Sequence, residues 1–230
     1  MKTIGLIGGM SWESTVSYYQ IINRTVKETL GGLHSAKCVL YSVDFQEIEE
    51  LQTQGDWEKS AEILIKSARS LEKAGADFII LCTNTMHKVA EKIENSISIP
   101  FIHIAECTAQ ALIDSQISKV GLLGTKYTME QDFYKSEITQ KGIEVLIPEK
   151  KDIAVVNDII YNELCQGVIK EDSQSQYLSI INKLVQKGAE GIILGCTEIG
   201  LLIQQKDTPI PLFDTTQIHA QASAVLSICE

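Results

Sequence analysis

The chain has 230 residues, of which 44% are hydrophobic and 22% charged, a composition typical of a folded protein with a sizeable core. Its formal net charge of -10 is spread along the sequence, and no Lys/Arg-rich run alternates with aromatic residues, which argues against nucleic acids as partners. No apolar stretch reaches membrane-spanning length, so we predict no membrane partner either.

The N-terminal segment predicts a strand, a tight turn and a helix. Residues 3–7 are apolar, Gly8 and Gly9 follow, and helical periodicity then runs from residue 14 to residue 30. This order does not fit a signal peptide. The six cysteines show no CxxC spacing, which favours reduced thiols, and we therefore expect a cytoplasmic protein.

The next segments continue the alternation of strands and helices. An apolar run at residues 37–43 predicts a second strand, and an acidic loop and a helix over residues 57–74 follow. Residues 78–81 predict a third strand, and short β-like segments come after prolines at residues 101–104 and 212–213. Because these strands show no alternating polar face, they indicate parallel sheets covered on both sides by helices.

An internal repeat sets the expected domain organisation. The segment KAGADFIIL at residues 73–81 is matched by QKGAEGIIL at residues 186–194, and TIGLIGG at residues 3–9 resembles KVGLLGT at residues 119–125. We therefore predict an α/β fold of two similar three-layer lobes with parallel sheets, related by an approximate two-fold axis. We expect the first lobe to comprise residues 1–98 and 207–230 and the second to comprise residues 99–206.

Each repeat ends in a polar tip where chemistry is expected, because parallel α/β sheets bind ligands beyond the carboxyl ends of their strands. The tips read LCTNTMH at residues 81–87 and LGCTEIG at residues 194–200. When the two repeats are aligned so that Leu81 matches Leu194, Thr83 matches Cys196. Inverting a stereocentre by proton exchange requires a proton acceptor on one face of the carbon and a donor on the other. The pair therefore predicts catalytic residues of an isomerase.

A thiol is a suitable base because it titrates near pH ~8.5, and a helix N-terminus lowers its pKa. We expect a helix to begin just after Cys196, so that the amides of Thr197 and Glu198 lower the pKa of the thiol and bind an anion. The same amides are suited to hold a substrate carboxylate while charge develops at Cα. Further hydrogen-bond donors come from other strand tips: Asn84, Thr85, Thr125 and Thr128.

Four segments together resemble one family: MKTIGLIGGMSWEST, CTNTMH, LLGTKYTMEQDFY and GCTEIG. Over essentially the whole chain they are similar to the aspartate/glutamate racemase superfamily, and most similar to its bacterial L-aspartate/glutamate-specific branch. The resemblance implies two α/β lobes with the active site between them, no pyridoxal phosphate or other cofactor, an amino-acid substrate and a homodimer. It also implies substrate contacts at Met10, Gln52, Thr83, Asn84, Thr85, Thr197 and Glu198.

The chain departs from the usual family pattern in three respects. Typical members carry a cysteine in both tips, whereas Thr83 stands at the first position here, as is characteristic of the L-specific branch. Glutamate racemases usually have a histidine at the position of Glu198, which argues against a cell-wall glutamate racemase. Typical aspartate racemases hold the distal carboxylate with an Arg and a Lys, and neither has a match here. Cys165 falls near the position of the Lys, and residues 47–50 fall near the position of the Arg.

The pair of Thr83 and Cys196 constrains the mechanism. A hydroxyl is a far weaker acid than a thiol, so Thr83 is suited to deliver a proton and not to rest as a base. We expect Cys196 to abstract the Cα proton, and Thr83, or a water ordered by it, to protonate the opposite face. Two enantiomers have equal free energy, so kcat/KM must be equal in both directions. Proton exchange with retention is then expected to outrun racemisation.

Two other functions stay open. One is a related enzyme of the superfamily, such as a hydantoin racemase, a maleate isomerase or an arylmalonate decarboxylase, for which one cysteine suffices. The other is a catalytically weakened amino-acid-binding protein.

The sequence also predicts roles for several residues outside the pair of Thr83 and Cys196. Cys82 is an alternative proton donor only if a bulge reverses its direction, because strand alternation points it away from the side of Thr83. His87 either orients Thr83 or packs, and His103 and His219 are expected to be structural. No metal site is predicted. Trp12, Tyr18 and Tyr19 are expected in helix packing or in the dimer surface.

Overall fold

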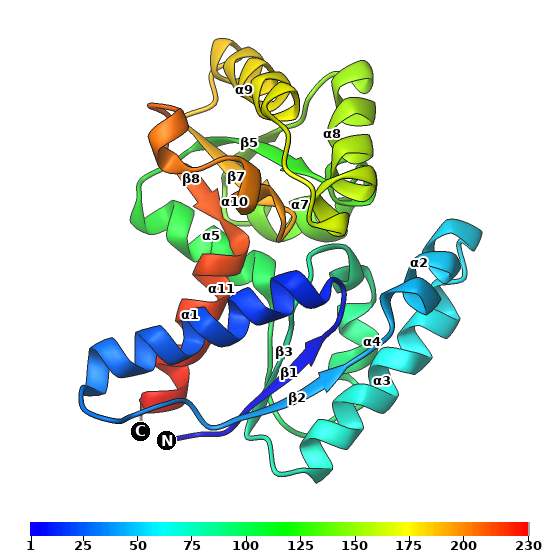
Figure 1. Ribbon diagram of the computed structural model, residues 1–230, viewed down its shortest axis with the longest axis vertical. Helices are drawn as coiled ribbons and strands as arrows, with labels where there is room; N and C mark the ends of the chain where they lie inside the picture. The colour runs from blue at the N-terminus through cyan, green and yellow to red at the C-terminus, as the bar shows by residue number, and fades with distance from the viewer. Residues whose placement is uncertain (230) are drawn as a thin grey trace. The chain divides into compact units, whose positions relative to one another are not determined.

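The computed structural model describes residues 1–229, which form two compact units (Figure 1). Unit 1 comprises Met1–Ile104 together with residues 219–229, and unit 2 comprises Ala105–Ile218. The boundaries lie further along the chain than those expected at residues 98 and 207. The reason is strand pairing, since residues 101–102 pair within the first sheet and residues 212–214 within the second.

Unit 1 contains a parallel sheet in the order β2-β1-β3-β4. Its strands are β1 (Ile4–Gly8), β2 (Cys38–Ser42), β3 (Phe78–Leu81) and β4 (Phe101–Ile102). Its helices are α1 (Trp12–Leu30), α2 (Phe45–Gln54), α3 (Trp57–Lys73), the 3-10 helix η1 (Thr85–Val89), α4 (Ala90–Glu94) and most of α11 (Thr215–Ile228).

Alternate residues of the central strands enter two apolar clusters, one on each face of the sheet. On one face Ile7 and Ile79 belong to a cluster with Leu64 of α3. On the other face Leu6 lies in a cluster with Ile22 of α1. Figure 1 shows α1 and α3 on opposite sides of the sheet. Each fully buried side chain of this kind stabilises the unit by ~2 kcal/mol, which holds the strand ends firmly in place.

Local capping explains where the helices of unit 1 begin and end. The Ser11 side chain accepts from the Ser14 amide, so α1 begins at Trp12, two residues earlier than expected. Helix α2 occupies the segment that we expected to be an acidic loop, and this prediction is wrong. Asp44 caps its N-terminus, Gly55 in a left-handed conformation ends it, and a buried Ile48 anchors it to the core.

Unit 2 has a second parallel sheet, in the order β6-β5-β7-β8. Its strands are β5 (Lys119–Gly124), β6 (Glu144–Leu146), β7 (Gly191–Gly195) and β8 (Leu212–Asp214). Its helices are all but the first residue of α5 (Ile104–Asp114), α6 (Lys126–Glu130), α7 (Asp132–Thr139), α8 (Lys150–Asn162), the 3-10 helix η2 (Leu164–Gln166), α9 (Glu171–Gln186), α10 (Ile199–Leu202), the 3-10 helix η3 (Gln205–Asp207) and the first turn of α11. In Figure 1 the neighbouring helices α8 and α9 are light green and yellow, and both contact β5.

The two sheets have the same strand order, and the repeated segments occupy matching strands. β1 corresponds to β5, and β3 corresponds to β7. The predicted α/β class with two similar parallel-sheet units is therefore confirmed. Within residues 1–229, no helix combines the length and the apolar character needed to cross a bilayer.

Candidate functional site

The polar tip after β3 forms the part of the candidate site that unit 1 supplies. β3 ends at Leu81, and the Thr83 amide turns back to donate a 2.9 Å hydrogen bond to the Leu81 carbonyl. The Thr83 carbonyl accepts a 2.7 Å hydrogen bond from Nδ1 of His87. Asn84 and Thr85 are also buried. The tip is thus a buried polar turn whose backbone is fixed on both sides of Thr83.

Met10 and Gln52 reach the same edge of the first sheet. Met10 follows the end of β1 and lies in the same apolar cluster as Met86 of η1. The buried Gln52 amide donates from Nε2 to the Met86 sulfur over 2.9 Å. Because Ile7 of β1 pairs beside Leu81 of β3, the predicted site residues of unit 1 gather at this one sheet edge.

Cys82 lies in the hydrophobic core and not with the polar tip. It is fully buried and belongs to the apolar cluster that contains Tyr18 and Ile22 of α1. Burial raises the pKa of its thiol above the ordinary range, and Cys38 adds to the effect. Strand alternation predicts this direction for the residue before Thr83. Such a thiol is poorly suited to acid-base chemistry.

The tip after β7 brings a thiol, a hydroxyl and a carboxylate together in unit 2. Oε2 of Glu198 accepts hydrogen bonds from Sγ of Cys196 over 3.0 Å and from Oγ1 of Thr197 over 2.7 Å. All three residues are buried. The thiol therefore has a proton acceptor within hydrogen-bonding distance. Sequence reasoning assigns Glu198 only to substrate binding, since nothing in the spacing of these residues reveals the bond.

The surroundings of Cys196 differ from those that we expected. Burial raises the pKa of the thiol well above its ordinary value, and the Glu198 carboxylate raises it further. The Glu198 amide lowers the pKa, as expected, but this is the smallest of the effects. Helix α10 is only four residues long, so its dipole is weak. The prediction of a thiol with a lowered pKa is therefore wrong.

Thr125 and Thr128 lie next to the Cys196 tip. β5 and β7 pair with Gly124 beside Gly195, so Thr125 and Cys196 each follow one member of this pair. Oγ1 of Thr125 caps α6 by accepting from the Thr128 amide over 3.3 Å. A Cβ on Gly124 would lie 2.8 Å from the Gly195 carbonyl oxygen. Glycine thus allows the ends of β5 and β7 to approach closely.

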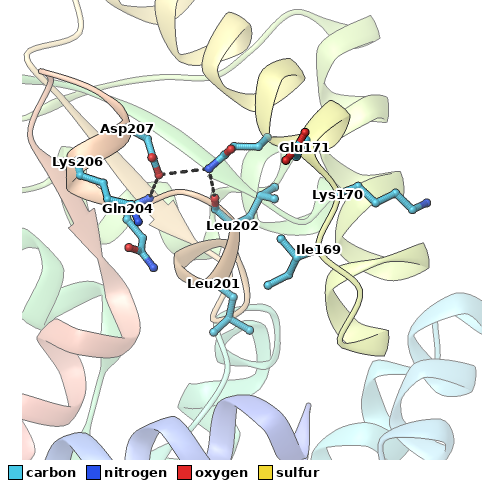
Figure 2. Close-up of a pocket in the computed structure, with 9 residues that line it drawn as sticks. Ile169, Lys170, Glu171, Leu201, Leu202, Gln204, Lys206 and Asp207 are labelled. Atoms are coloured by element: carbon cyan, nitrogen blue, oxygen red, sulfur yellow. Dashed lines mark hydrogen bonds between the residues drawn. The ribbon is translucent and has the colours of Figure 1, made fainter.

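A cavity of about 180 Å³ lies beside α10 in unit 2 (Figure 2). Gln174 spans one side of it by donating to the Leu202 carbonyl over 3.0 Å and to the Asp207 carboxylate over 3.4 Å. The cavity is lined by Ile169, Lys170, Glu171, Gln174, Leu201, Leu202, Gln204, Lys206 and Asp207. Since none of the predicted site residues lines it, this cavity forms no part of the predicted site.

Three histidines of unit 1 lie close together. The ring centroid of His87 is 4.4 Å from that of His103 and 6.1 Å from that of His219. Among residues 1–229, however, no three His, Cys, Asp or Glu side chains are grouped so that they could hold a metal ion. The nitrogens of His87 and His219 bond instead to the Tyr18 hydroxyl or to backbone groups.

Known proteins resemble the chain over nearly its whole length. The profile of the Asp/Glu/Hydantoin racemase family matches residues 7–223. The broad specificity amino-acid racemase RacX of Bacillus subtilis is 26% identical over 227 residues, which cover 96% of both chains. A proposed Asp/Glu racemase from Yersinia pestis is 55% identical, with full coverage of both chains and a TM-score of 0.93. PH1733 of Pyrococcus horikoshii, an aspartate racemase homologue, is 35% identical with 99% coverage of both chains and a TM-score of 0.86.

The family match includes both polar tips, because residues 83 and 196 lie inside the matched range. It also agrees with the resemblance seen in the four sequence segments. The chain therefore belongs to the Asp/Glu/Hydantoin racemase family and is an isomerase of that family.

Proposed function

We propose that the protein racemises an acidic or related α-amino acid without a cofactor, with Cys196 and Thr83 acting on opposite faces of Cα. The observation that carries the proposal is the 3.0 Å hydrogen bond from the Cys196 thiol to the Glu198 carboxylate. It gives a buried, protonated thiol a group that can take its proton. Thr83 occupies the matching position after the equivalent strand of the other sheet.

The proton on Cys196 has to leave before the sulfur can act as a base. Its pKa is raised by burial and by Glu198, so the resting group is a thiol. In the proposed first step Glu198 accepts this proton, and the thiolate then takes the proton from Cα of the substrate. The resulting charge spreads into the substrate carboxylate, which amides and hydroxyls of the tips are suited to bind: Thr125, Thr128, Thr197, Asn84 and Thr85.

Reprotonation of the opposite face is assigned to Thr83 or to a water that it orders. A threonine hydroxyl can pass on a proton, but it is too weak an acid to serve as a resting alkoxide. Abstraction and return of a proton on the Cys196 side are therefore expected to be faster than delivery on the Thr83 side. The proposal thus includes a second claim, that Cα exchange with retention exceeds racemisation.

Replacing Thr83 tests this division of labour. Thr83→Val removes the hydroxyl and keeps the shape, so the ratio of racemisation to Cα exchange should fall by about 10²-fold, the usual effect of one general acid. Thr83→Cys should raise the same ratio, because a thiol can act in both directions. Both rates are measured in deuterated water, by NMR for exchange and by chiral chromatography for inversion. Equal racemisation and exchange rates in the native protein would contradict the proposal.

The nature of the substrate side chain is tested by a panel of amino acids. Met10 and Gln52, both buried in unit 1, are proposed as contacts to the substrate. Exchange on L-aspartate and L-glutamate but not on apolar amino acids would support an acidic preference. Exchange on many amino acids would indicate a broad-specificity racemase. If no amino acid exchanges its Cα proton, the proposal fails, and a binding protein or another superfamily reaction takes its place.

We further propose that the protein works as a cytoplasmic homodimer. All six cysteines are free thiols, which suits a reducing compartment. Helix α1 exposes three apolar side chains at helical spacing: Trp12 (65% exposed), Val16 (44%) and Tyr19 (56%). An exposed apolar stripe of this kind suits a contact between two copies. Sedimentation equilibrium tests the state, and a monomeric mass at micromolar concentration contradicts the proposed dimer.

A further inference from the structure

His87 connects the Thr83 tip to a distant part of unit 1. Its side chain is 3% exposed and makes two hydrogen bonds to the backbone. Nδ1 lies 2.7 Å from the Thr83 carbonyl oxygen. Nε2 accepts from the Ile104 amide over 3.2 Å. The ring therefore joins the turn after β3 to the first residue of α5.

These two bonds define the tautomer of His87. A carbonyl oxygen can only accept, so the proton must lie on Nδ1, and an amide can only donate, so Nε2 must carry a lone pair. A protonated ring would place N–H against N–H at Ile104. Burial lowers the pKa of His87 well below its ordinary value, and His103 and His219 lower it further. The neutral ring is thus consistent with every group around it.

We propose that His87 is a positioning residue for the reaction, which holds the backbone of Thr83 so that its hydroxyl points at the substrate. This inference rests on the proposed role of Thr83. The hydrogen bond from His87 fixes the backbone of Thr83, the residue proposed to deliver the proton. His87 is therefore proposed to act through Thr83 and not through a contact of its own with substrate. Losing it should impair the inversion step more than the abstraction step at Cys196, because only inversion depends on the direction of the Thr83 hydroxyl.

The decisive measurement is the ratio of racemisation to Cα exchange in deuterated water. His87→Leu removes both hydrogen bonds and should lower the ratio by about tenfold or more, since a displacement of about 1 Å at a reacting group can cost up to 10²-fold. His87→Asn keeps an N–H donor near the position of Nδ1 and should restore most of the ratio. His87→Gln places its amide near the position of Nε2 instead, so the ratio should stay low.

His219 provides a matched control. It is fully buried in the same unit, but its bonds go to the Tyr18 hydroxyl and the Ile102 carbonyl and not to the tip. His219→Gln disturbs the core to a similar degree and should leave the ratio at the native value. If His219→Gln lowers the ratio as much as His87→Leu does, general loosening explains both effects and the inference is overturned.

The outcomes separate this inference from the proposed function. If Thr83→Val leaves the ratio unchanged, the role of Thr83 fails, whatever His87 does. If Thr83→Val lowers the ratio and His87→Leu does not, only the inference fails. A double variant, His87→Leu with Thr83→Val, should show no further fall in the ratio, because both changes remove the same step. Should His87→Leu not fold, the contrast between His87→Asn and His87→Gln still decides, and equal ratios in these two overturn the inference.

Discussion

Cys196→Ala is expected to reduce Cα proton exchange by about 10²- to 10⁴-fold, the range lost when a general base is removed. The reason is that Cys196 is the residue proposed to remove the Cα proton, whereas Glu198 is proposed only to accept the thiol proton. Exchange is measured by NMR on L-aspartate or L-glutamate in deuterated water, with circular dichroism as a check of folding. Substantial residual exchange in Cys196→Ala would mean that another base removes the proton.

Cys82→Ala is the matched control for this variant. Cys82 is also buried, even more deeply than Cys196, but it packs among apolar side chains of α1 and α11. Exchange should stay close to the native rate. A loss comparable to that of Cys196→Ala would transfer the acid-base role to Cys82 and contradict the present assignment.

Glu198→Gln distinguishes two effects of the carboxylate on the same thiol. The carboxylate raises the pKa of Cys196, so its neutralisation should lower that pKa, although burial still keeps it high. The variant also loses the acceptor for the thiol proton, so exchange at neutral pH should fall. The limb of the pH-rate profile that reports thiol ionisation should move to lower pH. A limb that does not move would show that Glu198 is not coupled to the thiol during catalysis.

The sequence predicted the fold well where one repeated pattern of apolar residues determines the secondary structure. Continuous apolar runs such as residues 78–81 predict buried parallel strands, and β3 has these bounds. The internal repeat predicts two similar sheets, and both have the same strand order. The assignment of Cys82 to the core follows from strand alternation alone.

The sequence was less informative where the structure depends on charged residues and on contacts between distant segments. The acidic segment after β2 has Phe45, Ile48 and Leu51 at helical spacing between the caps Asp44 and Gly55, so a helical signal is present, but the run of glutamates obscures it. The pKa of Cys196 depends on how deeply the tip is buried and on where the Glu198 carboxylate points. Neither quantity can be read from neighbours in the sequence. For the same reason the bond between His87 and Ile104 could not be predicted, because it joins two separate segments.

Acidification below pH ~6 is expected to destabilise unit 1 steeply, because burial keeps His87, His103 and His219 neutral. A histidine in the unfolded chain has a pKa near ~6.5. Burial lowers the pKa of His219 to about 3 and that of His103 to about 4, and it lowers that of His87 well below the ordinary value. Between the folded and unfolded values, the unfolded chain binds protons that the folded unit excludes. Stability is therefore complete above pH ~6.5 and decreases as the pH falls.

The expected slope is about 1.4 kcal/mol per pH unit for each histidine, or about 4.1 kcal/mol for His87, His103 and His219 together. Urea unfolding at pH 7, 6 and 5 measures it, and both tryptophans, Trp12 and Trp57, lie in unit 1, so their fluorescence reports on this unit alone. His219→Gln should lower the slope by about a third, whereas the same change at the exposed His34 should not alter it. Carboxylates titrate mainly below this pH range. A flat profile between pH 6 and 5 would therefore show that the histidines accept protons within the folded unit, and that the tip at Thr83 tolerates a charged neighbour.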